Sequence, residues 1–173
     1  MLDVEFSQVS DPGRTRTNNE DYLDFVAPDT PSEARTRGWL FALADGVGGH
    51  DYGEVASRAA IEKLIAGFRQ ADGSESHSVL LPKLVQAANT HVFEAAMATS
   101  KTGASMATTL VTCALRFDRA VIAHVGDSRC YLIRDRQAQQ LTRDHNVANE
   151  QIRLGLIAKG EAEGLSTSGI LSR

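Results

Sequence analysis

The sequence has few cysteines and no long hydrophobic run. Its 173 residues include two cysteines, Cys113 and Cys130, which lie too far apart for a zinc site or a disulfide framework, so we interpret them as buried thiols. No apolar stretch approaches the length of a membrane-spanning helix. Asp3 and Glu5 lie where a signal peptide would need a basic segment followed by an apolar run. These absences predict a cytoplasmic protein with no membrane partner.

Positive charge is not in excess either. The chain has 18 Lys and Arg against 22 Asp and Glu, a formal charge of −4, which argues against a nucleic-acid or anionic-membrane surface. The sequence has no G-x-x-x-x-G-K-[ST] phosphate loop and no G-x-S-x-G elbow, and neither cysteine lies in a glycine-rich nucleophile loop. Any hydrolytic chemistry is therefore predicted to use water as the nucleophile. Nothing in the sequence indicates the oligomeric state.

The most distinctive stretch is glycine-rich and follows an apolar run. Residues 39–44 predict a buried strand that ends at Asp45, and Gly46 and two further glycines precede His50. Glycine lets the backbone approach a ligand closely. A carboxylate beside a bare backbone carbonyl suits a hard cation such as magnesium or manganese. His50 adds a group that can carry a proton near neutral pH.

Hydrophobic periodicity predicts an α+β protein built as one domain over residues 1–173. At 42% hydrophobic content the chain can form a real core and has little room for a second domain. The segment 27–38, with two prolines and several charges, is interpreted as a surface connection. The late strands resemble an antiparallel meander, and both long helices are amphipathic and should cover a sheet. The predicted strands are 4–10, 22–26, 39–44, 107–115, 120–125, 130–133 and 139–141, and the predicted helices are 54–68, 78 or 80 to 97, and 146–154.

Several side chains near the first two interior strands can carry chemistry. Asp21 and Asp45 each lie at a strand boundary; alone, each is more simply a turn residue or a cap, but beside the glycines the pair favours a metal site. Glu20 either serves that metal through a water or faces solvent. Arg16 is either a solvated side chain or a fork that holds two phosphate oxygens. His50 is either a general acid or a residue that fixes its loop by hydrogen bonds.

Two aspartates further along the chain have competing interpretations. Asp127 follows an apolar strand and a glycine, so it is either another metal ligand or a hairpin turn residue whose ion-pair partner is Arg129. Asp144 is predicted to be the N-cap of the last helix, with no catalytic role.

Five motifs together resemble one protein family. In their order and spacing they resemble the bacterial branch of the metal-dependent serine/threonine protein phosphatases, type 2C, and they cover essentially the whole chain. The motifs are SDPGRTRTNNED (10–21), ADGVGGHDYGEVAS (44–57), ATTL (107–110), AHVGDSRCYLIRD (123–135) and LTRDHN (141–146).

The resemblance implies a fold and a metal site. The expected fold is an antiparallel β-sandwich flanked by α-helices, a four-layer αββα arrangement, with two Mg²⁺ or Mn²⁺ ions at one end. By resemblance, Asp45 bridges the two ions, the Gly46 carbonyl binds one, Asp21 belongs to the same site and Glu20 acts through a water. Asp127 corresponds to a third, weaker metal site.

The resemblance also implies a reaction and a substrate. Arg16 corresponds to the phosphate-binding arginine, His50 to the proposed general acid, and residues 153–163 to a mobile flap near the substrate cleft. The expected activity is hydrolysis of phosphoserine and phosphothreonine in a protein substrate, the product of a serine/threonine kinase, by a metal-activated water.

The family pattern continues beyond the motifs of this chain. Later D-G and D-N motifs, which supply two more metal-binding aspartates and further strands, are not present in these 173 residues. We therefore expect an N-terminal portion of the catalytic domain, which ends just after the flap. The alternative to an enzyme is a non-catalytic phosphoprotein-binding module, a pseudophosphatase or inactive fragment, that retains part of the metal site.

Overall fold

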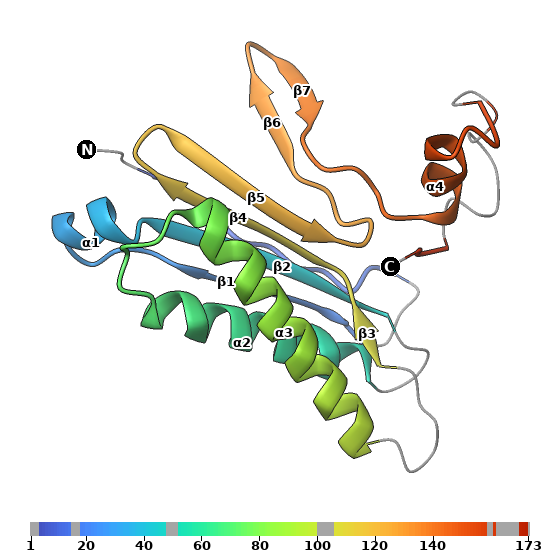
Figure 1. The fold of residues 1–173 in the computed structure, drawn as a ribbon, viewed down its shortest axis with the longest axis horizontal. Helices are drawn as coiled ribbons and strands as arrows, with labels where there is room; N and C mark the ends of the chain where they lie inside the picture. The colour runs from blue at the N-terminus through green and yellow to red at the C-terminus, as the bar shows by residue number, and fades with distance from the viewer. Residues whose placement is uncertain are drawn as a thin grey trace. The chain divides into compact units, whose positions relative to one another are not determined.

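The computed structural model describes residues 4–14, 18–47, 52–99, 106–158, 161 and 170–172. The chain divides into two compact units, Met1–Ala123 and His124–Arg173. Among the described residues, no helix has the length and apolar character needed to span a membrane. The elements (Figure 1) are β1 (Asp21–Val26), α1 (Pro31–Thr36), β2 (Trp39–Val47), α2 (Gly53–Gln70), α3 (His77–Thr99), β3 (Ala107–Thr108), β4 (Leu110–Arg116), β5 (Arg119–Val125), β6 (Tyr131–Arg134), β7 (Gln137–Gln140) and α4 (Val147–Arg153).

A five-stranded sheet organises the first unit. Its strands follow the order β1-β2-β4-β5, and the short β3 pairs with the end of β2. β2 is antiparallel to each of its neighbours β1, β3 and β4. β2 is therefore an interior strand, which pairs with β1 up to Asp45 and with β3 at Gly46 and Val47.

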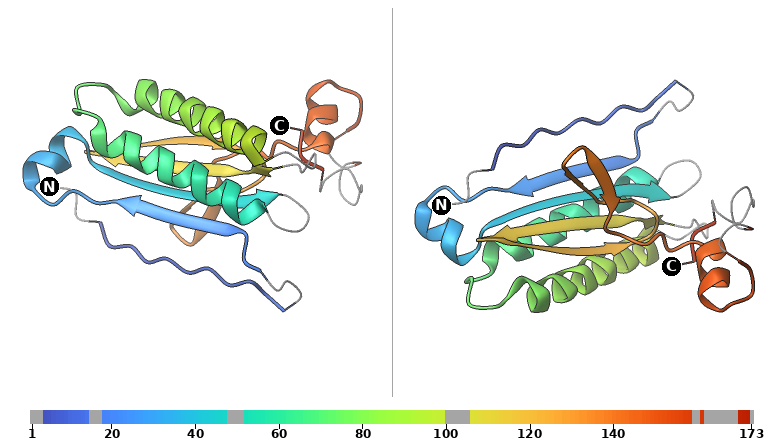
Figure 2. Two further views of the ribbon diagram at one scale, coloured as in Figure 1. Left: turned by 90° about the horizontal axis from the view of Figure 1, so that it is seen from below. Right: turned by 90° about the horizontal axis from the view of Figure 1, so that it is seen from above.

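The core lies between this sheet and two helices. Alternate residues of β2, such as Leu40 and Ala44, are fully buried and belong to the same cluster as Ile61 and Phe68 of α2 and Leu81 of α3. Figure 2 shows both helices on one face of the sheet. Burying each large side chain of this kind contributes roughly 1.5–3 kcal/mol, so the α2–β2 contact fixes the position of the strand.

The opposite face of the sheet carries an aromatic contact. The ring centroid of Phe6 lies 4.3 Å from that of Phe25 and 5.2 Å from that of Phe41. The segment that contains Phe6 runs extended beside β1 (Figure 2) but is not part of the sheet. The predicted strand over residues 4–10 is therefore wrong, because ring packing rather than a ladder of backbone hydrogen bonds holds this segment.

The connection 27–38 contains a helix that periodicity did not predict. Thr30 is the N-cap of α1 and its hydroxyl accepts from the Glu33 N–H at 3.2 Å, while Pro31 begins the helix. The Glu33 carboxylate in turn accepts from the Asp29 N–H at 2.8 Å. These contacts form a variant of the capping box, and a helix of six residues is too short to show a hydrophobic period.

The second unit contains a hairpin and a short helix. β6 and β7 are joined by Asp135 and Arg136, whose φ values of 52° and 61° are those of a type I′ turn. β7 therefore starts earlier than the predicted strand over residues 139–141. Asn146, not Asp144, is the N-cap of α4, and its side chain accepts from the Asn149 N–H at 2.8 Å.

Antiparallel sheets combined with helices confirm the predicted α+β class. The two long helices are somewhat longer than predicted, and Pro82 lies beyond the first turn of α3. The prediction of one domain over residues 1–173 stays a prediction.

Candidate metal centre

Asp21 and Asp45 lie directly opposite each other at the end of the β1–β2 ladder. Directly opposed residues of an antiparallel pair point to the same face, with Cβ atoms about 5 Å apart. Since Ala44 points into the core, Asp45 points to the face away from the helices. Two carboxylates so placed repel each other unless a cation lies between or beside them.

The backbone of Asp45 is held by two threonines. Its N–H donates to the Thr109 hydroxyl at 3.0 Å, and the Thr109 N–H donates to the Asp45 carbonyl at 2.9 Å. The Thr108 hydroxyl also donates to that carbonyl, at 3.0 Å. Thr109 is 1% exposed. The ATTL motif contributes to the family resemblance, but nothing in its sequence indicates this positioning role, because its partner lies 64 residues away.

Gly46 is required by a close backbone contact. A Cβ at Gly46 would lie 2.1 Å from the carbonyl oxygen of Gly53, the first residue of α2. A Cβ at Gly53 would lie 2.9 Å from the Glu20 Oε1, so this carboxylate lies against the start of the helix. The positive end of a helix dipole favours an anion there. The Gly46 N–H donates to the Glu20 carbonyl at 3.0 Å, which ties the three residues together.

This donor set fits a hard divalent cation. Carboxylates and backbone carbonyls are the ligands that magnesium and manganese prefer, and the strand ends bring Asp21 and Asp45 onto one face beside the Glu20 backbone. Within the described ranges, no group of three or more His, Cys, Asp or Glu side chains is arranged to hold a metal ion. The metal roles of Asp21, Asp45, Gly46 and Glu20 stay predictions.

Three of the predicted features fall wholly or partly outside the described residues. Arg16 and His50 lie there, and so does part of the predicted flap, of which residues 153–158 and 161 are described. Their predicted roles stay predictions.

Asp127 lies in the second unit, in a loop that follows β5. The preceding Gly126 has φ +96°, and it exchanges two hydrogen bonds with His145: the His145 N–H donates to the Gly126 carbonyl at 2.9 Å, and the Gly126 N–H donates to the His145 Nδ1 at 3.3 Å. The predicted alternative in which Arg129 pairs with Asp127 is wrong, because Arg129 pairs with Asp144. The metal role of Asp127 stays a prediction.

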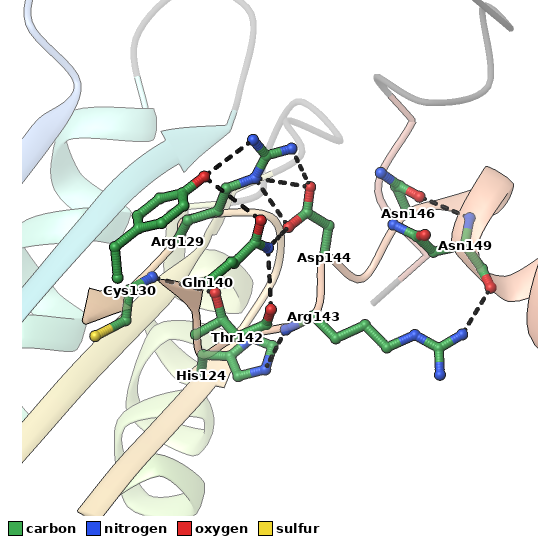
Figure 3. A network of polar contacts seen from close by, with 10 residues as sticks. His124, Arg129, Cys130, Gln140, Thr142, Arg143, Asp144, Asn146 and Asn149 are labelled. Carbon is green, nitrogen blue, oxygen red and sulfur yellow. Dashed lines mark hydrogen bonds and ion pairs between the residues drawn. The ribbon is translucent and has the colours of Figure 1, made fainter. Parts of the chain in front are cut away.

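Asp144 is the centre of a polar network (Figure 3). The Arg129 guanidinium reaches both of its oxygens, with Nη2–Oδ2 at 2.6 Å, and the Gln140 amide donates to it at 2.9 Å. Burial alone would raise the pKa of Asp144, but the hydrogen bonds and charge of Arg129, with Gln140, outweigh burial and hold the pKa below its ordinary value. The carboxylate raises the pKa of Arg129 in return. Sequence reasoning missed this pair because its members lie 15 residues apart.

Two histidines stack beside this network. The ring centroids of His124 and His145 lie 4.5 Å apart at an interplanar angle of 24°. The His124 Nε2 accepts from the Arg143 N–H at 3.4 Å. Burial lowers the pKa of His124, against the opposing charge of Asp144. A neutral ring fits the acceptor role of its Nε2.

Comparison with known proteins identifies the relatives of this chain. A family model described as protein phosphatase 2C matches residues 14–156. Protein phosphatase PhpP of Streptococcus pneumoniae is 31% identical over 172 residues, which are 98% of this chain and 67% of that protein.

Solved structures agree with the sequence matches. The crystal structure of the Mycobacterium tuberculosis serine/threonine phosphatase PstP/Ppp superposes with a TM-score of 0.78 at 32% identity, and covers 95% of this chain and 65% of that chain. The catalytic domain of the serine/threonine protein phosphatase PstP in complex with two manganese ions gives a TM-score of 0.70 at 34% identity, and covers 89% of this chain and 61% of that chain. The chain thus spans about two thirds of the length of these relatives. Agreement in both sequence and fold over nearly its whole length shows that the chain belongs to the protein phosphatase 2C family.

Proposed function

We propose that this chain is a metal-dependent protein serine/threonine phosphatase, which hydrolyses phosphoserine and phosphothreonine by attack of an activated water. The observation that carries the proposal is the cross-strand pair of Asp21 and Asp45 on one face of the sheet. Opposed carboxylates with their backbones fixed are arranged for cation binding rather than for stability of the sheet alone.

The cofactor proposed is Mn²⁺ or Mg²⁺, two ions at Asp21 and Asp45 and a third at Asp127. Such ions, when bound, lower the pKa of a water and offset the charge of a phosphate. The solved relative with two manganese ions supports a divalent metal. The threonine contacts hold the Asp45 backbone, which carries this carboxylate, at the end of β2. Arg16 would hold the phosphate oxygens and His50 would protonate the leaving oxygen.

The proposed substrate is a phosphorylated protein produced by a serine/threonine kinase. The names of the relatives, which are protein phosphatases, support this class of substrate. A cytoplasmic location belongs to the same proposal, on the grounds of the sequence features described above.

A second candidate function is a non-catalytic module that binds a phosphoprotein. The observation in its favour is that the described residues contain no group of three or more metal-binding side chains. A module of this kind would keep the carboxylate pair and would bind a phosphopeptide without turnover.

Manganese binding and turnover on the same samples distinguish the two candidates. We expect the 173-residue chain to bind Mn²⁺ in calorimetry and to hydrolyse a phosphothreonine peptide, and we expect Asp45→Ala to lose both, because it removes one carboxylate of the pair. Glu62→Gln on the exposed face of α2 is the control, since its contact with Arg58 lies at the surface. Turnover that survives in Asp45→Ala would refute the enzyme proposal. Peptide binding without any turnover would establish the binding module.

A further inference from the structure

Within the second unit, the loop that carries Asp127 contacts one short segment of the same unit on both sides of Asp127. We call residues 126–129 the Asp127 loop and residues 142–146 the clamp segment. The clamp segment and the Asp127 loop meet through two hydrogen bonds between Gly126 and His145. They also meet through the ion pair between the side chains of Arg129 and Asp144, which Figure 3 shows. These contacts lie outside the predicted catalytic roles of the chain.

Consecutive clamp residues hold the positions on both sides of Asp127. His145 exchanges two hydrogen bonds with Gly126, which directly precedes Asp127. Asp144 holds the guanidinium of Arg129, two positions after Asp127, in a fork that uses both carboxylate oxygens. The Asp127 loop is therefore held at Gly126 and at Arg129, the positions that flank Asp127.

The rest of the clamp segment reinforces this arrangement. The Thr142 hydroxyl accepts from the Cys130 N–H at 3.1 Å, immediately after the loop. Asp144 is 8% exposed, and Gln140 supplies a second donor to its carboxylate. A buried carboxylate whose oxygens are both engaged by donors holds its partners in a defined geometry.

The clamp segment is also joined to the residues that follow α4. The Ser172 N–H donates to the His145 carbonyl at 3.0 Å, and the Val147 N–H donates to the Ile170 carbonyl at 2.9 Å. Asn146 and Leu171 form an antiparallel bridge. His145 thus contacts both the Asp127 loop, through its N–H and ring, and the far end of the segment that includes the predicted flap, through its carbonyl.

We propose that Asp144 and His145 are positioning residues for Asp127, and that they hold its carboxylate in the geometry that the third, weaker metal site requires. This inference rests on the proposed function, because that function makes Asp127 a metal ligand. Residues that orient a metal ligand without contacting the metal typically change the metal affinity by about ten- to a hundredfold when they are mutated. Asp144 and His145 would act on the metal only through the loop.

Manganese calorimetry on the 173-residue chain tests the proposal, with Asp127→Ala defining which class of sites depends on Asp127. We expect Asp144→Asn and His145→Ala to lower the manganese affinity of the Asp127-dependent sites by about tenfold. The affinity of the sites that depend on Asp45 should change by less than about twofold. His145→Asn, whose side-chain oxygen can accept from the Gly126 N–H, should restore part of the affinity. Asp118→Asn and His91→Ala, both on exposed side chains, are the matched controls.

Hydrogen exchange of the Gly126 and Asp127 amides provides a readout that needs no metal. We expect faster exchange at these amides in Asp144→Asn and His145→Ala than in the controls. If Asp144→Asn does not fold, Gln140→Ala removes one donor to the same carboxylate and takes its place. In the turnover assay, the clamp variants should raise the manganese concentration needed for half-maximal activity more than they lower the maximal rate.

The outcomes separate this inference from the proposed function. If the clamp variants leave the manganese affinity of the Asp127-dependent sites unchanged, the positioning role is overturned while the phosphatase proposal stands. Absence of any Asp127-dependent class also overturns it, and Asp45-dependent turnover would then still support the enzyme. Absence of both Asp45-dependent binding and turnover would refute the proposed function and the inference together.

Discussion

Thr109 and Gly46 fix the backbone on both sides of the Asp45 side chain. Thr109 donates one hydrogen bond to the Asp45 backbone and accepts one from it, and Gly46, which has no Cβ, lies against Gly53 at the start of α2. Neither residue offers a charged group to a metal. Their contribution is to orient the carboxylate before a cation arrives, which is how residues behind a ligand usually act.

Replacing Thr109 with valine should test the position of Asp45 without removing its charge. Valine keeps the volume of the side chain but leaves the Asp45 N–H without its acceptor, which should lower the free energy of unfolding by about 1–3 kcal/mol. We also expect about tenfold weaker manganese binding, since Asp45 loses a fixed direction. Urea unfolding and calorimetry measure the two effects. Thr90→Val on the exposed side of α3 is the control, and equal behaviour of the two variants would contradict the prediction.

At the scale of elements, the start of α3 is fixed by a buried histidine. His77 is 5% exposed, and its Nε2 lies 2.8 Å from the Arg37 carbonyl at the end of α1. Arg116 of β4 bonds to the Thr36 and Gly73 carbonyls nearby. Burial lowers the pKa of His77, the Arg37 carbonyl opposes this and the charge of Arg116 adds to it.

Stability should therefore fall in mildly acidic solution. The unfolded chain takes up a proton at His77 near its ordinary pKa of 6.5, whereas the folded chain does so only at lower pH. Protons thus favour the unfolded state as the pH falls below 6.5 toward the folded pKa, and the loss is complete below the folded pKa. Urea unfolding between about pH 7.5 and 5.5 should show a smaller loss for His77→Gln, which can still donate to the Arg37 carbonyl.

The control for this pH dependence is His91→Gln, because His91 is an exposed histidine on the same helix. It should keep the wild-type slope of stability against pH. A slope in His77→Gln equal to that of the wild type would show that the protonation of His77 is not coupled to folding.

The β6–β7 turn offers a stabilising substitution. Asp135 and Arg136 both have positive φ, which glycine and asparagine accept more readily than other residues. Arg136→Gly should slow amide exchange in the hairpin and stabilise it by about 0.5–1 kcal/mol. Arg134→Gly, in a strand position before the turn, should do the opposite. Faster exchange in Arg136→Gly would contradict the turn assignment.

At the scale of the whole molecule, a bound cation should stabilise the folded chain. A ligand that binds only the folded state adds about 2.7 kcal/mol at a hundred times its dissociation constant. We expect manganese to shift the urea midpoint of the wild-type chain and to have no such effect on an Asp21→Asn, Asp45→Asn double variant. A shift that survives in the double variant would place the bound ion elsewhere.

Local patterns predicted much of this architecture. The buried run before Asp45 and the 3.6-residue periods of the two long helices correspond to β2, α2 and α3, and the five motifs identified the family. The expectation that two strand ends would bring Asp21 and Asp45 together agrees with their direct pairing.

The features that sequence reasoning missed depend on contacts between distant residues or on very short elements. Thr109 meets Asp45 across 64 positions, and Arg129 meets Asp144 across 15. Hydrophobic periodicity gives no information on such pairs, so the sequence predicts only a cap at Asp144, whereas the cap is Asn146. α1 has six residues, and only its Thr-Pro start could have indicated it. The extended segment of Phe6 alternates like a strand but is held by ring contacts instead.

Gly46, near the end of β2, is in close backbone contact with Gly53, the first residue of α2. This contact holds together the two ends of the segment that connects β2 to α2. When the two ends of a connecting segment are held together, its length can change with little loss of folding free energy. Doubling the length of a loop costs only about 0.6 kcal/mol in closure entropy. An insertion between Val47 and Tyr52 should therefore leave β2 and α2 joined at this contact and change the free energy of unfolding by less than about 1 kcal/mol.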